Sequence, residues 1–167
     1  TTLQKKCDIC KYWSEHPGKR CYESTVFAPF PNGHPRKPTV MDRVLNMWSG
    51  WRWSLSELRE AAQNPVNSAL GRKLDRHIFR ILCNCDWEKY QFLMCLLAVK
   101  FRNPAFRPDC TIIFTGKEGA GKSMVFNECV LPFAGANGMK CDDIGRLFSE
   151  FNYLSEHKLI VVLDEAS

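Results

Sequence analysis

The stretch Gly116-Lys117-Glu118-Gly119-Ala120-Gly121-Lys122-Ser123 decides the fold that we expect for this chain. It follows an apolar run at residues 110–115, which predicts a buried strand, and precedes residues 124–131, which predict a helix. A Gly-x4-Gly-Lys-Ser sequence between a strand and a helix is typical of a phosphate-binding loop. The glycines let successive backbone N–H groups point toward an anion, and the helix N-terminus adds its positive dipole end. The alternative is a glycine-rich turn that matches the pattern by accident.

The members of this stretch have separate expected roles. Lys122 would reach the β- and γ-phosphates of a nucleoside triphosphate, and the Ser123 hydroxyl would coordinate Mg²⁺. The backbone that would surround the phosphates belongs to Gly116, Lys117, Glu118, Gly119, Ala120 and Gly121. The expected ligands are therefore ATP and Mg²⁺.

A second element further along the chain supports this interpretation. Residues 159–163 form a short aliphatic run that predicts a parallel strand buried on both faces, and Asp164 and Glu165 follow it directly. Carboxylates at the end of such a strand lie at the ligand-binding edge of an α/β sheet. Asp164 would hold Mg²⁺ through water, and Glu165 would polarise the attacking water. Taken alone, Asp164 could also be an ordinary acid that ends a strand.

The composition agrees with a folded protein outside the membrane. Of 167 residues, 45% are hydrophobic and 12% aromatic, which is enough for a packed core. The longest apolar run, at residues 92–99, is too short to span a bilayer, and no stretch reads as a signal peptide. Nine cysteines without a secretory signal favour an intracellular, reducing compartment over a disulfide framework.

The net charge of +5 is distributed unevenly. Residues 1–110 hold 18 Lys and Arg against 10 Asp and Glu, whereas residues 111–167 hold 5 against 8. Part of the basic excess lies on residues 70–82, which predict an amphipathic helix with one basic face, formed by Arg72, Lys73, Arg76 and Arg80. This face either is solvated or contacts nucleic-acid phosphates.

Two aromatic or cysteine-rich features before the loop leave alternatives open. Cys7, Cys10, His16 and Cys21 nearly match a zinc knuckle, but the spacer before the histidine is one residue too long, so an unliganded turn at residues 17–18 is the alternative. The three tryptophans at positions 48, 51 and 53 either form a small core or stack on nucleic-acid bases.

Shorter elements complete the expected order. Helices are predicted at residues 56–63, capped by Ser56, and at residues 87–101, capped by Asp86. From Phe92 onward the second helix is apolar nearly all round and should be buried. A loop at residues 133–138, a strand at residues 139–141 and a helix after Asp143 are predicted between the two nucleotide motifs. The fold class is therefore α/β. We expect a mainly helical accessory region at residues 1–105 and the first part of a P-loop NTPase domain, with a parallel sheet, at residues 106–167.

These features together resemble the superfamily 3 helicase-like ATPases that are fused to primases in large DNA viruses, phages and plasmids, poxviruses among them. The likeness is sharp only in residues 86–167 and thin before them. It rests on an apolar helix followed by Asn103-Pro104, a strand leading into the glycine stretch, Phe151-Asn152, and the ending Asp164-Glu165-Ala166, with weaker support from residues 13–20 and 46–50.

The resemblance implies a homo-hexameric ring that hydrolyses ATP and pulls single-stranded or forked DNA through its pore, beside a primase, in the host cytoplasm or nucleus if the protein is viral. It weakens the zinc interpretation, since similar lead-in segments lack the cysteines. The family's polar sensor, arginine finger and pore hairpin would follow Ser167. A later strand would also separate the strand before the loop from the strand before Asp164. We therefore expect the chain to be part of a longer protein, and to be poorly soluble and unable to sustain hydrolysis by itself.

Two function classes follow. The first is the ATP-hydrolysing motor of a DNA helicase, and the alternative is a nucleotide-binding switch or assembly module with little or no hydrolysis. A kinase-like transferase fits less well, because an Asp-Glu pair after the second strand suits activation of water rather than of an acceptor.

Replacement of Glu165 by Gln separates the two classes. In the full-length protein we expect Glu165→Gln to retain ATP binding and to lower phosphate release by about 10²- to 10⁴-fold, because an amide cannot accept a proton from water. Asp164→Asn should instead weaken binding of the metal. Phosphate release at the wild-type rate in Glu165→Gln would contradict the motor mechanism and leave the switch.

Overall fold

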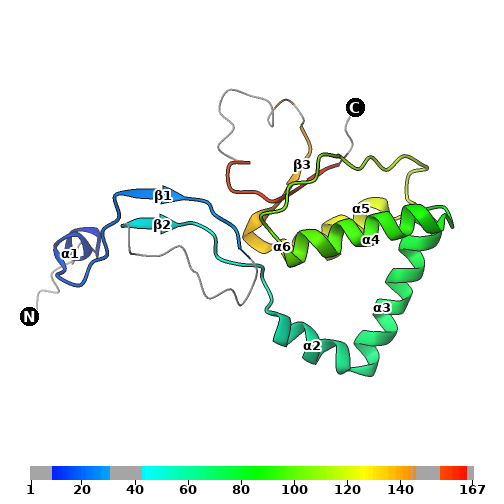
Figure 1. Cartoon of the computed structure of the whole chain (residues 1–167), viewed down its shortest axis with the longest axis horizontal. Helices are drawn as coiled ribbons and strands as arrows, with labels where there is room; N and C mark the ends of the chain where they lie inside the picture. Colours follow the sequence, from blue (N-terminus) through cyan, green and yellow to red (C-terminus); the bar gives the residue numbers. More distant parts are fainter. Residues whose placement is uncertain (1–8, 31–42, 144, 146–154, 165–167) are drawn as a thin grey trace, which may run out of the picture.

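The computed structural model describes residues 9–30, 43–143, 145 and 155–164, which form a mixed α/β arrangement of helices and two small parallel sheets (Figure 1). Strand β1 pairs with β2, and β3 pairs with β4. The elements in chain order are α1 Ile9–Glu15, β1 Ser24–Val26, β2 Val44–Asn46, α2 Leu55–Gln63, α3 Pro65–His77, η2 Ile78–Leu82, α4 Trp87–Arg102, α5 Lys122–Met124, η3 Val125–Val130, α6 Leu131–Ala134, η4 Gly135–Asn137, β3 Gly138–Cys141 and β4 Ile160–Leu163.

A tryptophan-centred cluster joins the first part of the chain to the helix that follows the glycine stretch. Trp48 and Trp51 are each only 7% exposed and pack edge to face on one another and around the fully buried Ala134. The Trp51 ring nitrogen donates to the carbonyl of Phe101 at 2.9 Å, and that of Trp48 donates to the carbonyl of Phe30 at 3.2 Å. The core interpretation is therefore confirmed for these two tryptophans, whose rings are not available to stack on bases.

A second cluster packs the two longest helices against the helix after the loop. Its buried members come from η2, α4 and η3, with Cys83 between the first two, and they are Ile78, Cys83, Leu93 and Val125. The prediction of a helix over residues 70–82 is confirmed as α3 followed by η2, and Asp86 caps α4 as predicted by accepting from Glu88 and Lys89 N–H groups.

Two details of the helices differ from the prediction. The cap of α2 is Ser54 rather than Ser56, because Ser54 and Glu57 form a capping box in which each side chain accepts from the other's backbone N–H. The nearly complete burial predicted for α4 is wrong: Leu93 is buried, but Phe92 and Val99 are 56% and 43% exposed. One face of α4 packs on the second cluster, and no element within the described ranges covers the opposite face.

The strand predicted at residues 110–115 takes part in no ladder among the described residues. The segment still alternates like a strand, since Ile112 and Phe114 pack on the second cluster while Ile113 is 81% exposed. The prediction of a buried, paired strand is wrong here because β4 pairs with β3 and no other described strand lies beside the segment.

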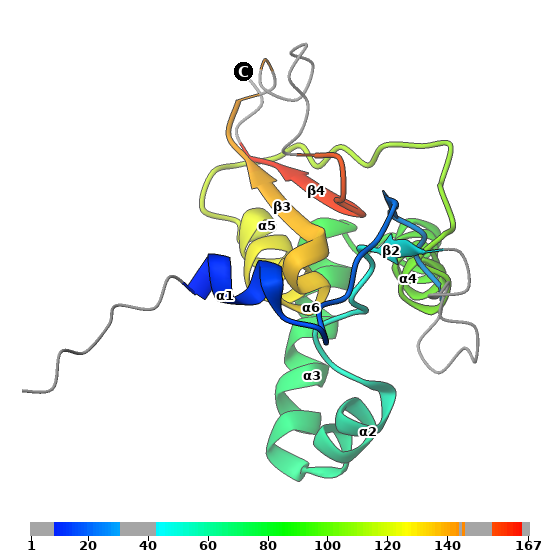
Figure 2. The same cartoon turned by 90° about the vertical axis from the view of Figure 1, so that its left-hand side faces the viewer.

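Strands β3 and β4 lie side by side (Figure 2), and β4 is the strand that ends just before Asp164. The two strands are parallel, with Gly138 opposite Ile160 and Cys141 opposite Leu163. Both strand predictions are confirmed, but the burial of β4 on both faces is wrong, since Val161 and Leu163 are exposed. The loop predicted at residues 133–138 is instead the end of α6 followed by η4.

Packing crosses the domain boundary predicted near residue 105. The first cluster joins Trp51 to Ala134, and the second joins Leu93 to Val125. The division into residues 1–105 and 106–167 stays a prediction. In the part of the chain described here, no helix combines the length and the apolar composition that crossing a bilayer requires.

Truncation of Trp51 tests the first cluster. We expect Trp51→Ala to lower the free energy of unfolding by about 3–5 kcal/mol, because it removes a large buried ring and the hydrogen bond to Phe101. Trp13→Ala, at a ring that is 56% exposed, should change it by less than about 0.5 kcal/mol. Urea unfolding followed by far-ultraviolet circular dichroism measures both, and equal losses would contradict the assignment of Trp51 to the core.

Candidate functional site

The glycine loop, residues 116–123, turns sharply into α5. Gly119 and Gly121 have φ angles of +70° and +80°, a left-handed conformation that residues with a Cβ rarely adopt. Space is a further constraint at Gly121, because a Cβ there would lie 2.9 Å from Nε2 of His77. The loop therefore needs glycine for its backbone curl and for the close approach of the C-terminal end of α3.

Lys122 folds back over the loop. Its ammonium donates to the carbonyls of Gly116 at 2.9 Å and Lys117 at 2.7 Å. Two neutral acceptors hold the cation without neutralising it, so its positive charge remains available to an anion within the curl. This is the position from which a lysine can contact phosphate oxygens.

The structure brings Ser123 and Asp164 together, although 41 positions separate them in the sequence. The Ser123 hydroxyl donates to Oδ1 of Asp164 at 2.6 Å. Asp164 directly follows β4, and its backbone N–H donates to Cys141 of β3 at 3.2 Å, which continues the ladder by one residue. The contact thus joins the helical end of the glycine loop to the carboxyl end of the parallel strand pair.

Two further side chains contact the same carboxylate, and the sequence analysis missed both. Asn127 Nδ2 donates to Oδ2 of Asp164 at 3.2 Å, and Lys140 Nζ lies 3.0 Å from the same oxygen. Lys140 also lies 3.2 Å from Asp142. Asn127 stands four positions after Ser123, a spacing that places both on one face of a helix and that could have indicated it. Lys140 becomes evident only from the β3–β4 register, which places it opposite Val162, two residues before Asp164.

These donors favour the ionised form of Asp164. The hydrogen bond from Ser123, and next the one from Lys140, lower the pKa of the Asp164 carboxyl. Asp164 and Asp142 in turn raise the pKa of Lys140. Asp164 is therefore a carboxylate at neutral pH, the form that a metal ligand requires.

The donor set fits magnesium. A hydroxyl and a carboxylate are hard oxygen ligands, and Mg²⁺ in nucleotide sites commonly takes only one or two protein groups beside phosphates and water. Among the described residues, no group of three or more His, Cys, Asp and Glu is placed to hold a metal by itself. A Mg²⁺ ion held here by Ser123 and Asp164 would take its remaining ligands from phosphate oxygens and water.

Two predicted sites are only partly within the described residues. Glu165 lies outside them, so its place relative to Asp164 stays a prediction. Cys7 also lies outside them, and the zinc set is therefore incomplete. His16 of that set accepts the Gly18 N–H at 3.0 Å through Nδ1 and stacks on Trp13, and residues 17–18 form a turn. Zinc binding and an unliganded turn both stay predictions.

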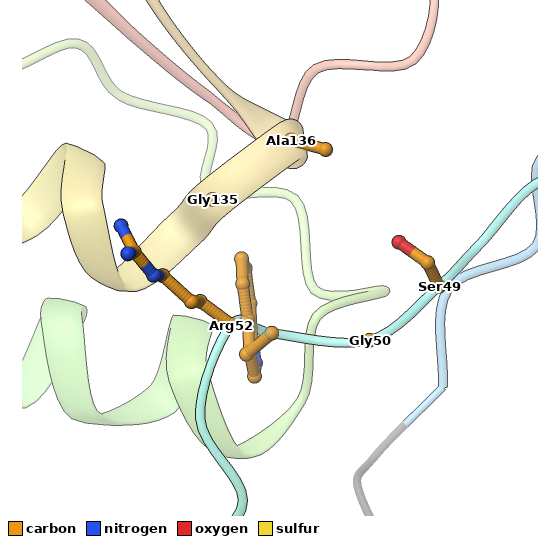
Figure 3. Close-up of a pocket in the computed structure, with 6 residues that line it drawn as sticks. Ser49, Gly50, Arg52, Gly135 and Ala136 are labelled. Carbon is orange, nitrogen blue, oxygen red and sulfur yellow. The ribbon is translucent and has the colours of Figure 1, made fainter.

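A depression of about 530 Å³ lies beside Gly135 and Ala136 (Figure 3), which follow the last residue of α6. Gly50 and Gly135 are among the residues that line it, and Arg52 is its charged lining residue. The Arg52 guanidinium lies 5.0 Å from the ring centre of Trp53. The backbone N–H of Arg52 donates to the carbonyl of Phe133 at 3.2 Å. None of the loop residues and no part of Asp164 lines this depression, so it is separate from the candidate site.

Comparison of the chain with protein families, with curated proteins and with solved structures finds no match.

The contacts of Asp164 predict a pH dependence of stability. Because folding lowers the pKa of Asp164, its contribution is fully present above the unfolded pKa near 3.8 and is lost as the pH falls through the folded pKa. We expect Asp164→Asn to be less stable than the wild type at pH 7, and the difference to shrink below about pH 4. Asp109→Asn is the control, because Asp109 is exposed and is not among the residues that contact Asp164. Urea unfolding at pH 7 and pH 3 measures this, and a difference that grows at pH 3 would contradict it.

Proposed function

We propose that this chain binds ATP with Mg²⁺ at the glycine loop and supplies the ATPase of a nucleic-acid motor of the superfamily 3 helicase type. The observation that carries the proposal is the 2.6 Å hydrogen bond between Ser123 and Asp164. Two residues selected from separate sequence motifs, as the two sides of one metal site, lie in direct contact. If the glycine-rich turn matched the pattern by accident, no contact between its end and the Asp164 carboxylate would be expected.

The proposed binding reaction uses the side chains in these positions. The triphosphate would lie in the curl of the glycine loop, and Lys122 would exchange its two backbone carbonyl contacts for phosphate oxygens. Ser123 would contact Mg²⁺ directly, and Asp164 would orient the water around it. When bound, the metal neutralises charge on the phosphates. Glu165, next in the chain, would take the proton of the attacking water.

The basic face of α3 and η2 is the surface on which the proposed nucleic-acid partner would bind. Arg72, Arg76 and Arg80 are exposed, as both contact with phosphates and ordinary solvation require. Between Arg76 and Arg80, His77 ends α3 and lies against Gly121 of the loop. A polyanion on this face would therefore touch an element that contacts the nucleotide site. Single-stranded or forked DNA, a homo-hexameric ring and a neighbouring primase belong to the same proposal, through the resemblance alone.

The alternative proposal, a nucleotide-binding switch or assembly module, uses the same binding residues and differs only in turnover. A complete P-loop sheet is likewise part of the proposal. Within the described ranges residues 110–115 join no ladder, so the structure shows only the β3–β4 pair of such a sheet.

Removal of the Lys122 ammonium tests nucleotide binding. In the full-length protein we expect Lys122→Ala to weaken Mg²⁺–ATP binding roughly 100-fold, about 3 kcal/mol, because charge-assisted contacts with the phosphates are lost. Lys158→Ala is a matched control, since Lys158 also donates to a backbone carbonyl, that of Ala136. Titration calorimetry gives both affinities. Equal ATP affinity in the wild type and Lys122→Ala would refute the proposed site.

A further inference from the structure

Asn127 has a place in the site that the two motifs do not explain. It lies on η3, the direct continuation of the helix that begins with Lys122. Its Nδ2 donates to one oxygen of Asp164, at 3.2 Å, while Ser123 donates to the other, at 2.6 Å. Two donors on one rigid helix that hold two different oxygens fix both the position and the plane of the carboxylate.

The orientation of the Asn127 amide follows from its partner. A carboxylate only accepts hydrogen bonds, so the NH₂ end of the amide must face Asp164. The oxygen end, Oδ1, is then buried and has no hydrogen-bond partner among the described residues. A buried unpaired acceptor is destabilising, and a leucine of similar shape would avoid this cost. Among the described residues, the Asn127 side chain thus has its donor to Asp164 as its hydrogen bond and an unpaired Oδ1 beside it, a combination that suits a residue serving a site.

Lys140 cannot take over this role when a metal binds. Its ammonium also contacts Oδ2 of Asp164, but a divalent cation near Asp164 would repel it. Asp142, at 3.2 Å, offers the ammonium another partner. Asn127 is uncharged and is not repelled, so its contact can persist in both the metal-free and the metal-bound state.

We propose that Asn127 is a positioning residue that holds the Asp164 carboxylate in the orientation required for Mg²⁺. This inference rests on the proposed function, since it assigns Asn127 to the metal side of the same site. It acts through Asp164 and contacts no reacting atom. Its loss should therefore change the dependence on Mg²⁺ and leave the affinity for metal-free nucleotide unchanged.

The test measures ATP binding by calorimetry at a series of Mg²⁺ concentrations and in EDTA, with the full-length protein. We expect Asn127→Leu to raise the Mg²⁺ concentration at half-maximal stimulation of binding roughly tenfold, with ATP affinity in EDTA unchanged. Its urea midpoint should equal or exceed that of the wild type, because the unpaired oxygen is removed. A purely structural asparagine would lower stability and would not move the Mg²⁺ midpoint.

Two further variants make the outcome decisive. Asn127→Ala removes the same donor with a smaller side chain and should show the same shift in Mg²⁺ midpoint, and Glu128→Gln, at the exposed neighbouring position, should show none. An unchanged midpoint in a folded Asn127 variant, or failure of both Asn127 variants to fold, overturns this inference alone. If the wild type binds no ATP, or binds it without regard to Mg²⁺, the proposed function falls together with it.

Discussion

The carboxylate of Asp164 connects the parts of the candidate site. Its two oxygens receive donors from three separate places: the end of the glycine loop, the next turn of the same helix, and the neighbouring strand β3. The strand pair and the helix are thereby held in one relative position at the point where a ligand would lie. Without this acceptor, Lys140 would keep only Asp142 as an ion-pair partner, and Ser123 would lose the partner of its hydroxyl.

The two hydrophobic clusters provide the framework for this contact. Ala134 and Val125, one at each end of the same helical segment, are buried in different clusters, so the helix is held at both ends by residues from the first hundred positions. The region that precedes the glycine loop is therefore part of the support of the site. His77 shows the same coupling on a smaller scale, because its ring fills the space beside Gly121 that any larger residue there would need.

Local patterns predicted the elements well, whereas long-range pairing limited the rest. The glycine-rich stretch and the aliphatic run before Asp164 can be recognised from sequence because each is defined by a few consecutive residues. The partners of a strand are not: residues 110–115 have the composition of a buried strand, yet pairing depends on neighbours that the run itself does not specify. The burial of α4 failed for a related reason, since apolar composition does not say which elements cover Phe92. Lys140 required the strand register, and Asn127 required the knowledge that a carboxylate lies across from the helix. Of the nucleotide-site residues selected from sequence, only Glu165 lies outside the described part of the chain.

The extended segment at residues 110–115 has a consequence for local stability. It is anchored by the side chains of Ile112 and Phe114 but joins no ladder within the described residues, whereas β3 and β4 protect each other's amides. Amide hydrogens along the segment should exchange with solvent through small local openings, far faster than those of the strand pair. The glycine loop thus lies between the segment at residues 110–115, which has no strand partner among the described residues, and the packed helix that begins at Lys122. A ligand that contacts both would restrict the motion of residues 110–115, and the entropy lost by this ordering would weaken its binding.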